Sequence, residues 1–185
     1  SSTSPPVSAL TMAEARARMR AGGSELNTLA EAIETCRGRC GLNVELKELN
    51  QEADALSLLQ QNFEPDNLMM QSFYARVVWQ LRKRAPHIQS GLLVGAATPS
   101  DPWHWRKLDL YPEPRLLGCR ARFVAPRKGL AKPAFLARMR RLGLPIHVWT
   151  VNEEAHVQRM LAADVDGIIT DQAERVLAMR DQHRQ

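Results

Sequence analysis

A chain of 185 residues has the usual length of a single domain, and a hydrophobic content of 44% suits a globular protein with a buried core. Lys and Arg outnumber Asp and Glu by 25 to 20, but the excess lies in short clusters where helix ends favour cations, so a nucleic-acid partner is not expected. No apolar run approaches the roughly 20 residues that cross a bilayer, so a membrane span is not expected either.

The three cysteines, Cys36, Cys40 and Cys119, form no even disulfide framework and have no zinc-site spacing, which predicts reduced thiols in a cytoplasmic protein. The Ser/Pro-rich residues 1–7 are expected to form a disordered tail, and residues 8–185 a single α/β domain. The first residues contain neither a secretion leader nor an initiator Met, which is typical of a processed chain or a piece of a longer protein.

Segments with the hydrophobic period of a helix alternate along the chain with segments that have the hydrophobic pattern of a strand. Helices are expected at 9–21, from Thr28 to Gly38, at 51–62 and 74–84, from Pro133 to Gly143, from Glu153 onward and from Asp171 to about 182. Strands are expected at 43–47, 68–73, 91–97, 120–126, 144–152 and 165–170. Thr28 and Glu31 form a capping box, Gly143 suits a left-handed helix end, and Asn152 is positioned to cap the helix that follows it.

Six strands that alternate with helices at this spacing predict a parallel sheet built from right-handed crossovers, either doubly wound or part of a barrel. No Gly-rich phosphate-binding loop of the GxGxxG or GxxxxGK[ST] kind follows any strand. Residues 98–118 are rich in Pro and aromatic residues and long for a connection, so they are either a functional loop or a packed structural insert.

Candidate site residues lie where the strands end, because parallel α/β folds assemble their sites at the C-terminal ends of strands. Glu45 and Lys47 share one face of the first strand with Asn43. A carboxylate inside a barrel is costly unless it is paired or bound to metal, so Glu45 is a candidate ligand of a hard cation and Lys47 a candidate partner of an anionic oxygen. Alternatively, the two side chains pair with each other.

Two further candidates come from later strands. Gln71 ends the second strand, where it either contacts a ligand or satisfies backbone groups. Trp149 ends the fifth strand and is either a pocket wall or part of the core. His147 shares the face of Trp149 but lies deeper, which is more typical of a packed histidine than of a catalyst.

Taken in order, several segments resemble the glycerophosphodiester phosphodiesterase family. They are TLAEAIETCRGRCGLNVELK at 28–47, QSFYARVVWQLRKRAP at 71–86, AP at 125–126, GLPIHVWTVNEE at 143–154 and VDGIITDQ at 165–172. The resemblance covers about residues 28–180. Each short motif alone is weak, but the ordered series is specific.

The resemblance implies a TIM-type (β/α) barrel with a divalent cation, Mg or Ca, at the strand C-termini, and hydrolysis of glycerophosphodiesters to glycerol 3-phosphate and an alcohol. It implies that Glu45 is a metal ligand, that Lys47 contacts the phosphate, and that Gln71 and Trp149 line the substrate pocket. The cation would neutralise charge on the phosphoryl oxygens.

The family also begins with a strand ending in HRG, a PENT segment, a Glu-x-Asp strand and a further His, and none of these occurs in this chain. No catalytic acid or base is therefore located, and the barrel is expected to be incomplete, with about six of eight strands. The chain is expected to be inactive alone, either as part of a longer enzyme or as a truncated relative. In a truncated relative, residues 1–27 would fill the gap in the barrel or the open edges would form a homo-oligomer. The alternative function is a non-catalytic, barrel-derived module that binds a phosphorylated ligand or a protein partner.

Overall fold

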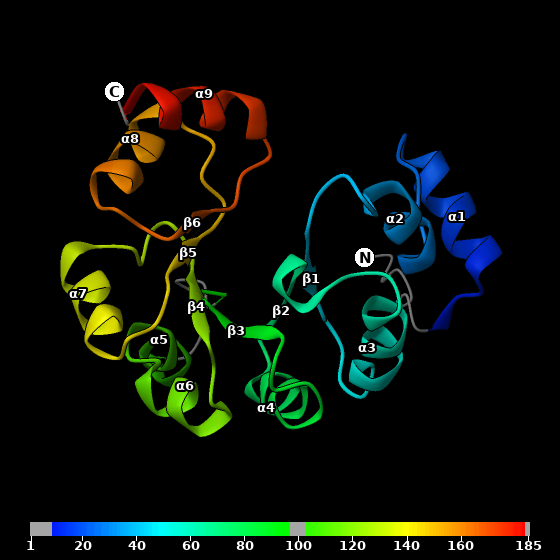
Figure 1. Ribbon diagram of the computed structural model, residues 1–185, viewed down its shortest axis with the longest axis horizontal. Coiled ribbons are helices and arrows are strands. Elements are labelled where there is room, and N and C mark those ends of the chain that lie inside the picture. The colour runs from blue at the N-terminus through cyan, green and yellow to red at the C-terminus, as the bar shows by residue number, and fades with distance from the viewer. Residues whose placement is uncertain (1–8, 97–102, 184–185) are drawn as a thin grey trace. The chain divides into compact units, whose positions relative to one another are not determined.

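The structure of the chain is a computed structural model that describes residues 9–96 and 103–183. The chain divides into two compact units, Ser1–Cys40 and Gly41–Gln185 (Figure 1). The expected disordered tail, residues 1–7, lies outside the described residues. The assignment of residues 8–185 to one domain stays a prediction.

The first unit contains two helices that begin with the same capping arrangement. They are α1 (Met12–Ala21) and α2 (Leu29–Cys36). The hydroxyl of Thr28 accepts a hydrogen bond from the Glu31 amide, and the Glu31 carboxylate accepts one from the Thr28 amide, which confirms the predicted capping box. Arg16 donates to both Glu31 oxygens at 2.7 and 2.8 Å. The hydrogen bonds from Thr28 and then from Arg16 lower the pKa of Glu31 to about 2.

The second unit is built on parallel strands, and the six predicted from the sequence are all present. They are β1 (Leu42–Glu45), β2 (Leu68–Ser72), β3 (Gln89–Val94), β4 (Phe123–Pro126), β5 (His147–Val148) and β6 (Gly167–Ile168). The strands β1 to β4 pair in chain order, β5 pairs with β6, and two parallel bridges join β4 to β5. The six strands therefore follow one another in sequence order, as in the wall of a barrel (Figure 1).

The last two strands are shorter than their sequence patterns predict. The pattern favours strands at 144–152 and 165–170, whereas regular pairing covers two residues in each. Backbone hydrogen bonds continue beyond these residues, from Trp149 N to Pro126 O at 3.1 Å toward β4 and from Val151 N to Ile169 O at 3.0 Å toward β6. The paired segments thus extend beyond the two residues of each strand that have regular ladder geometry.

Helices follow the strands and cover their outer face (Figure 1). They are α3 (Glu52–Gln60), α4 (Ala75–Arg84), α5 (Trp103–Leu110), α6 (Glu113–Cys119), α7 (Pro133–Arg141), α8 (Glu154–Ala162) and α9 (Ala173–His183), with a 3-10 turn at Pro65–Asn67. Gly143 follows α7 with φ of 69°, which confirms the predicted left-handed position. No helix of the described residues is long and apolar enough to span a membrane.

The insert at 98–118 is helical in its described part. The sequence pattern favours irregular structure there because of its prolines, but Pro114 lies in the first turn of α6, where a missing N–H costs nothing. Buried Leu116 and Cys119 then pack α6 against the core. The insert is thus packed through α6, and residues 98–102 lie outside the described part.

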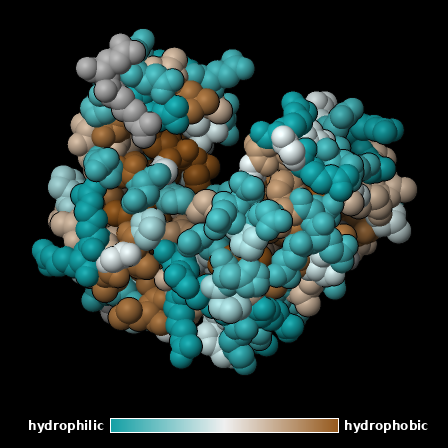
Figure 2. Space-filling view, in the orientation of Figure 1, coloured by the Kyte–Doolittle hydropathy of each residue, from teal (hydrophilic) through white to brown (hydrophobic). Residues whose placement is uncertain are grey.

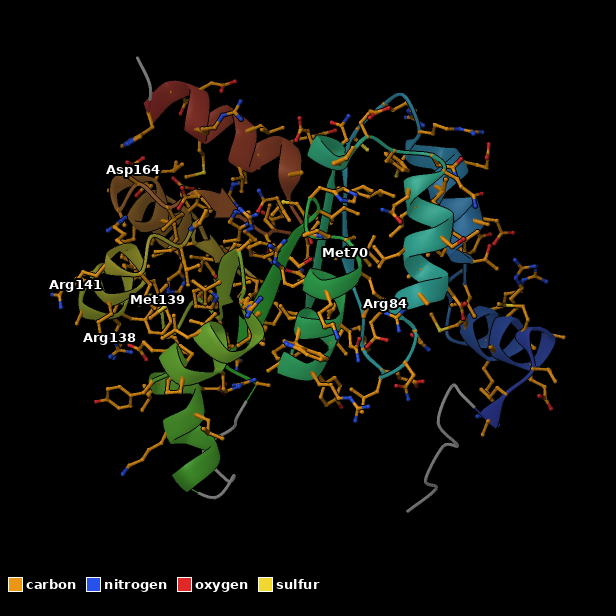
Figure 3. All side chains as sticks on the ribbon, turned by 60° about the horizontal axis from the view of Figure 1, so that its bottom comes forward. Met70, Arg84, Arg138, Met139, Arg141 and Asp164 are labelled. Atoms are coloured by element: carbon orange, nitrogen blue, oxygen red, sulfur yellow. The ribbon has the colours of Figure 1, made fainter. Side chains whose placement is uncertain are left out.

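Two hydrophobic layers lie on the two faces of the strands. The larger one packs Leu92, Val124 and Val148 against the helices. Met139 of α7 belongs to this layer and is fully buried, whereas Arg141 at the end of the same helix is exposed (Figure 3). Hydrophilic side chains cover most of the face seen in Figure 2, with smaller hydrophobic areas between them.

The smaller layer fills the inner face of the strands. It consists of Leu93, Phe123 and Ala125, with Met69, Phe73 and Trp149 packed against it. Side chains alternate between the two faces of a strand, so Gln71 lies on this inner face between Met69 and Phe73. The interior of the strand array is therefore a packed core at its centre, as in a closed barrel.

Candidate active site

A pocket of about 600 Å³ lies at the C-terminal ends of the first strands. Glu45, Leu46 and Lys47 line it from the end of β1, and Phe73 and Tyr74 from the segment after β2. The rest of its wall comes from Ala75, Ala96 and the helical insert. This is the end of the fold where parallel α/β proteins bind their ligands.

Glu45 and Lys47 both line this pocket, as the alternation of β1 predicts. The Lys47 ammonium lies 3.4 Å from the Glu45 carboxylate. The lysine side chain is 77% exposed, and an ion pair this open to water contributes little to stability. The pair is therefore loose enough for either group to exchange its partner for a ligand.

Gln71 carries an unsatisfied polar atom in the interior. It is the register partner of Glu45 on the neighbouring strand, and only 6% of it is exposed. Its Oε1 is buried and has no hydrogen-bond donor among the described residues. A buried acceptor without a donor costs free energy, and a ligand hydroxyl or another donor that reached it would remove that cost.

Trp149 is part of the inner wall and does not itself line the pocket. Its indole Nε1 donates a hydrogen bond to the Ala125 carbonyl at 2.6 Å, which fixes the ring. The ring packs edge to face on Phe73, with centroids 5.5 Å apart, and Phe73 lines the pocket. The structure thus brings Glu45 and Lys47 together in the pocket, with Trp149 behind Phe73.

Two charged pocket residues escaped the sequence analysis, Asp109 of α5 and Arg115 of α6. Arg115 donates a hydrogen bond to the Phe73 carbonyl at 2.8 Å and lies 3.5 Å from the Asp109 carboxylate. Asp109 is only 8% exposed. The one sequence signal for these residues was the length of the insert, which does not indicate which of its side chains reach the site.

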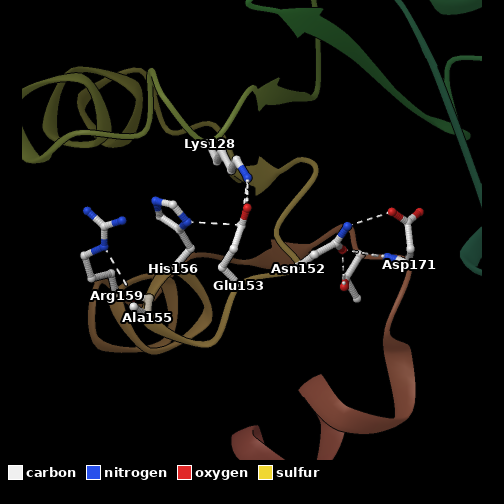
Figure 4. A network of polar contacts seen from close by, with 8 residues as sticks. Lys128, Asn152, Glu153, Ala155, His156, Arg159 and Asp171 are labelled. Carbon is white, nitrogen blue, oxygen red and sulfur yellow. Dashed lines mark hydrogen bonds and ion pairs between the residues drawn. The ribbon is translucent and has the colours of Figure 1, made fainter.

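A separate polar network joins the ends of β4, β5 and β6 (Figure 4). Lys128 donates to Glu153 at 2.7 Å, and the imidazole of His156 lies 3.1 Å from the same carboxylate. The contact with Lys128 is the main reason why the pKa of Glu153 falls to about 2, with a smaller contribution from His156. Lys128 is thus already paired with the Glu153 carboxylate.

Asn152 is not the helix cap that its position predicts. Glu153 occupies the cap position of α8, and the Asn152 side chain turns to the end of β6 (Figure 4). Its Oδ1 accepts hydrogen bonds from Thr170 Oγ1 and the Asp171 amide, both at 3.0 Å, and its amide donates to the Asp171 carboxylate at 2.7 Å. These tertiary partners satisfy the side chain better than one exposed helix end would.

His147 lies in the interior, away from the pocket. Its ring stacks on Phe123 with centroids 4.8 Å apart. Burial lowers the pKa of His147, and the nearby Asp166 carboxylate opposes that effect only in part. The histidine is therefore a half-buried residue packed inside the strand array, in agreement with its predicted depth.

A divalent cation at this site would need more oxygen ligands than the described residues provide. Hard cations take six to eight oxygens, and the carboxylate of Glu45 and the unsatisfied Oε1 of Gln71 are the two donors on neighbouring inward positions. No group of three or more His, Cys, Asp or Glu side chains with metal-binding geometry occurs in the described part of the chain. These residues do not fit a complete cation site by themselves.

Comparison with known proteins adds an independent finding. The family model described as "Glycerophosphoryl diester phosphodiesterase family" matches residues 7–175. A glycerophosphodiester phosphodiesterase from Caldanaerobacter subterraneus subsp. tengcongensis is 29% identical over 116 residues, which are 63% of this chain and 43% of that protein. The chain thus spans less than half the length of this curated relative.

Solved structures share the fold. A candidate glycerophosphoryl diester phosphodiesterase from Silicibacter pomeroyi DSS-3 superposes with a TM-score of 0.79 at 24% identity, over 99% of this chain and 72% of its own. A phosphodiesterase from Oleispira antarctica, solved with the product sn-glycerol-3-phosphate, gives 0.68 at 21% identity, over 85% of this chain and 62% of its own. These likenesses confirm the predicted TIM-type barrel fold, of which six strands are seen in the described residues.

Proposed function

The chain belongs to the glycerophosphoryl diester phosphodiesterase family, and from that premise we propose that it forms part of a site that hydrolyses glycerophosphodiesters to glycerol 3-phosphate and an alcohol. The observation that carries this proposal is the pocket at the ends of β1 and β2, where Glu45 and Lys47 lie together. The same family supports a small-molecule substrate.

Lys47 is the proposed contact for the phosphate. Its ammonium is held only by the loose ion pair with Glu45, so it can turn to an anionic oxygen with little loss. Gln71 is proposed to accept a hydrogen bond from a glycerol hydroxyl, which would satisfy its buried Oε1. Trp149 is proposed to support the apolar wall through its contact with Phe73.

The family implies a divalent cation, and we propose Glu45 as one of its ligands and Mg or Ca as the metal. When bound, the cation would neutralise charge on the phosphoryl oxygens. The described residues offer too few ligands to hold it alone, so the contribution of this chain is substrate binding. The other carboxylate of the pocket, Asp109, faces Arg115 and is not poised as a free acid or base.

We therefore expect the 185-residue chain to bind glycerol 3-phosphate but not to turn over a diester. Binding is measured by isothermal titration calorimetry, and turnover by release of glycerol 3-phosphate from glycerophosphocholine with Mg or Ca. Lys47→Ala should weaken binding by about tenfold, the effect of roughly 1.4 kcal/mol. Lys132→Ala, at the exposed start of α7, is the matched control.

Two results would contradict these proposals separately. Absence of glycerol 3-phosphate binding to the unaltered chain would refute the binding site. Sustained release of glycerol 3-phosphate that Glu45→Ala abolishes would refute the expected inactivity, while supporting the family function.

Self-association and location are part of the same proposal. Among the described residues β1 and β6 each pair with one strand only, and unpaired strand edges favour association with another chain. We propose a homo-oligomer formed through these edges, which would appear as a concentration-dependent mass in analytical ultracentrifugation.

We propose the cytoplasm as the location of the protein because the three cysteines are free thiols; fractionation of cells would test this.

A further inference from the structure

We infer that Arg115 is a second positively charged substrate-positioning residue of the pocket, which binds a phosphoryl oxygen together with Lys47. The inference rests on the proposed function and deepens it. Arg115 comes from α6 in the insert, whereas Lys47 follows β1, yet both side chains line the same pocket. A phosphate in this pocket therefore has two cations within one cavity.

Burial distinguishes the two cations. The Arg115 side chain is 25% exposed, while that of Lys47 is 77% exposed. Water screens a charge at an exposed site much more than at a partly buried one. Arg115 is therefore the cation of this pocket whose attraction for an anion is screened least by solvent.

The guanidinium is also held in one orientation before any ligand arrives. One terminal nitrogen donates to the Phe73 carbonyl at 2.8 Å, and the other faces the Asp109 carboxylate at 3.5 Å. Because Phe73 follows β2, the first contact ties the side chain to the end of the strand array. A side chain that is already ordered loses less entropy when a ligand binds.

These contacts leave capacity for a phosphate. A guanidinium has five N–H groups in a planar fork that matches phosphate oxygens in a bidentate geometry. Among the described residues, the hydrogen bonds of Arg115 are one from each terminal nitrogen. The contact with Asp109 is long for a charge-assisted hydrogen bond, so a phosphate oxygen can compete with it.

The competing explanation is that Arg115 only fastens α6 to the end of β2. Both explanations predict weaker binding when the side chain is lost, so affinity at one pH does not separate them. They differ in their dependence on ligand charge. A phosphate-binding arginine favours the dianion over the monoanion, whereas a structural clamp affects both equally.

The test is calorimetric titration of the 185-residue chain with glycerol 3-phosphate at about pH 5 and about pH 8, on either side of the second phosphate ionisation near pH 6. Arg115→Gln should weaken binding about tenfold at the higher pH and clearly less at the lower pH. Arg115→Lys, which keeps the charge but loses the fork, should recover part of the affinity. The control Arg141→Gln changes an exposed arginine at the end of α7 (Figure 3) and should have no effect.

Each outcome decides the inference. Unchanged binding by Arg115→Gln, with binding weakened in Lys47→Ala, would overturn the role of Arg115 and leave the proposed function intact. An equal loss at both pH values would also overturn it, in favour of the structural clamp. If the unaltered chain binds no glycerol 3-phosphate, both the inference and the proposed function fail. If Arg115→Gln does not fold, as judged by circular dichroism, the two titrations of Arg115→Lys decide.

Discussion

The rings of Phe123 and His147 stack inside the strand array, with centroids 4.8 Å apart and planes inclined by 19°. Each ring also lies over a glycine that is its register partner on the neighbouring strand. A Cβ at Gly91 would come within 2.2 Å of the Phe123 ring, and one at Gly167 within 3.0 Å of the His147 ring. The inner core is therefore packed by large rings set against residues without side chains.

Replacing Gly91 should destabilise the second unit. In Gly91→Ala the new methyl group would overlap with the Phe123 ring, which is buried and cannot move without disturbing its contact with His147. Overpacking of this kind costs about 1–3 kcal/mol, and urea denaturation measures it as a lower midpoint. Gly118→Ala is the control, because nothing lies within 4 Å of its Cβ and alanine favours helix α6. Equal midpoints for the two variants would contradict this packing.

The half-buried imidazole of His147 should make the free energy of unfolding depend on pH. Burial lowers the pKa of His147 from its ordinary value of 6.5. Below pH 6.5 the unfolded chain takes up a proton on this imidazole more readily than the folded chain does. The contribution of His147 to the free energy of unfolding is therefore fully present above pH 6.5 and is lost as the pH falls below it. The limiting slope for one proton is about 1.4 kcal/mol per pH unit.

Denaturation of the His147→Gln variant at several pH values would test this dependence. The variant should be less stable overall because it loses the ring stack, but its stability should fall less steeply below pH 6.5 than that of the unaltered chain. Parallel curves for the two proteins would mean that another group titrates in this range.

The side chain of Asn152 should stabilise the contact between the ends of β5 and β6. Asn152→Ala removes three hydrogen bonds to Thr170 and Asp171, and we expect a loss of about 1–2 kcal/mol in the free energy of unfolding. Asn152→Asp should be at least as harmful at neutral pH, because it places a second carboxylate beside Asp171. The control Gln158→Ala removes only an exposed 3.5 Å contact and should change stability by less than about 0.5 kcal/mol.

Glu45 should oppose anion binding when no cation is present. Glu45→Gln removes a negative charge from the pocket and frees Lys47 from its ion pair. The comparison is made in a buffer that contains a metal chelator. Two unit charges about 4 Å apart in water interact with about 1 kcal/mol, and the variant loses this repulsion between Glu45 and the phosphate. Glycerol 3-phosphate should therefore bind roughly fivefold tighter to the variant in calorimetric titration. Glu64→Gln, an exposed change elsewhere, controls for net charge. Weaker binding by Glu45→Gln in chelator would mean that the carboxylate itself contacts the ligand.

Local signals in the sequence predicted the elements well. The alternation of side chains in β1 predicted that Glu45 and Lys47 share one face, and both side chains line the pocket. The pair Thr28 and Glu31 predicted its own capping contact because both partners lie within one helical turn. Asn152 was misassigned because its partners are 18 and 19 residues away, and a local pattern does not report them.

The sequence by itself determined the family, the order of the strands along the chain and the shared face of Glu45 and Lys47, because hydrophobic period and motif order are local properties of the chain. Tertiary structure alone decided which distant groups share the pocket. Arg115 reaches the carbonyl of Phe73 across 42 residues of sequence, through an insert whose helices depend on packing against the core. Such contacts arise from the folded arrangement of whole elements, and for that reason the second cation of the site became visible only in the structure.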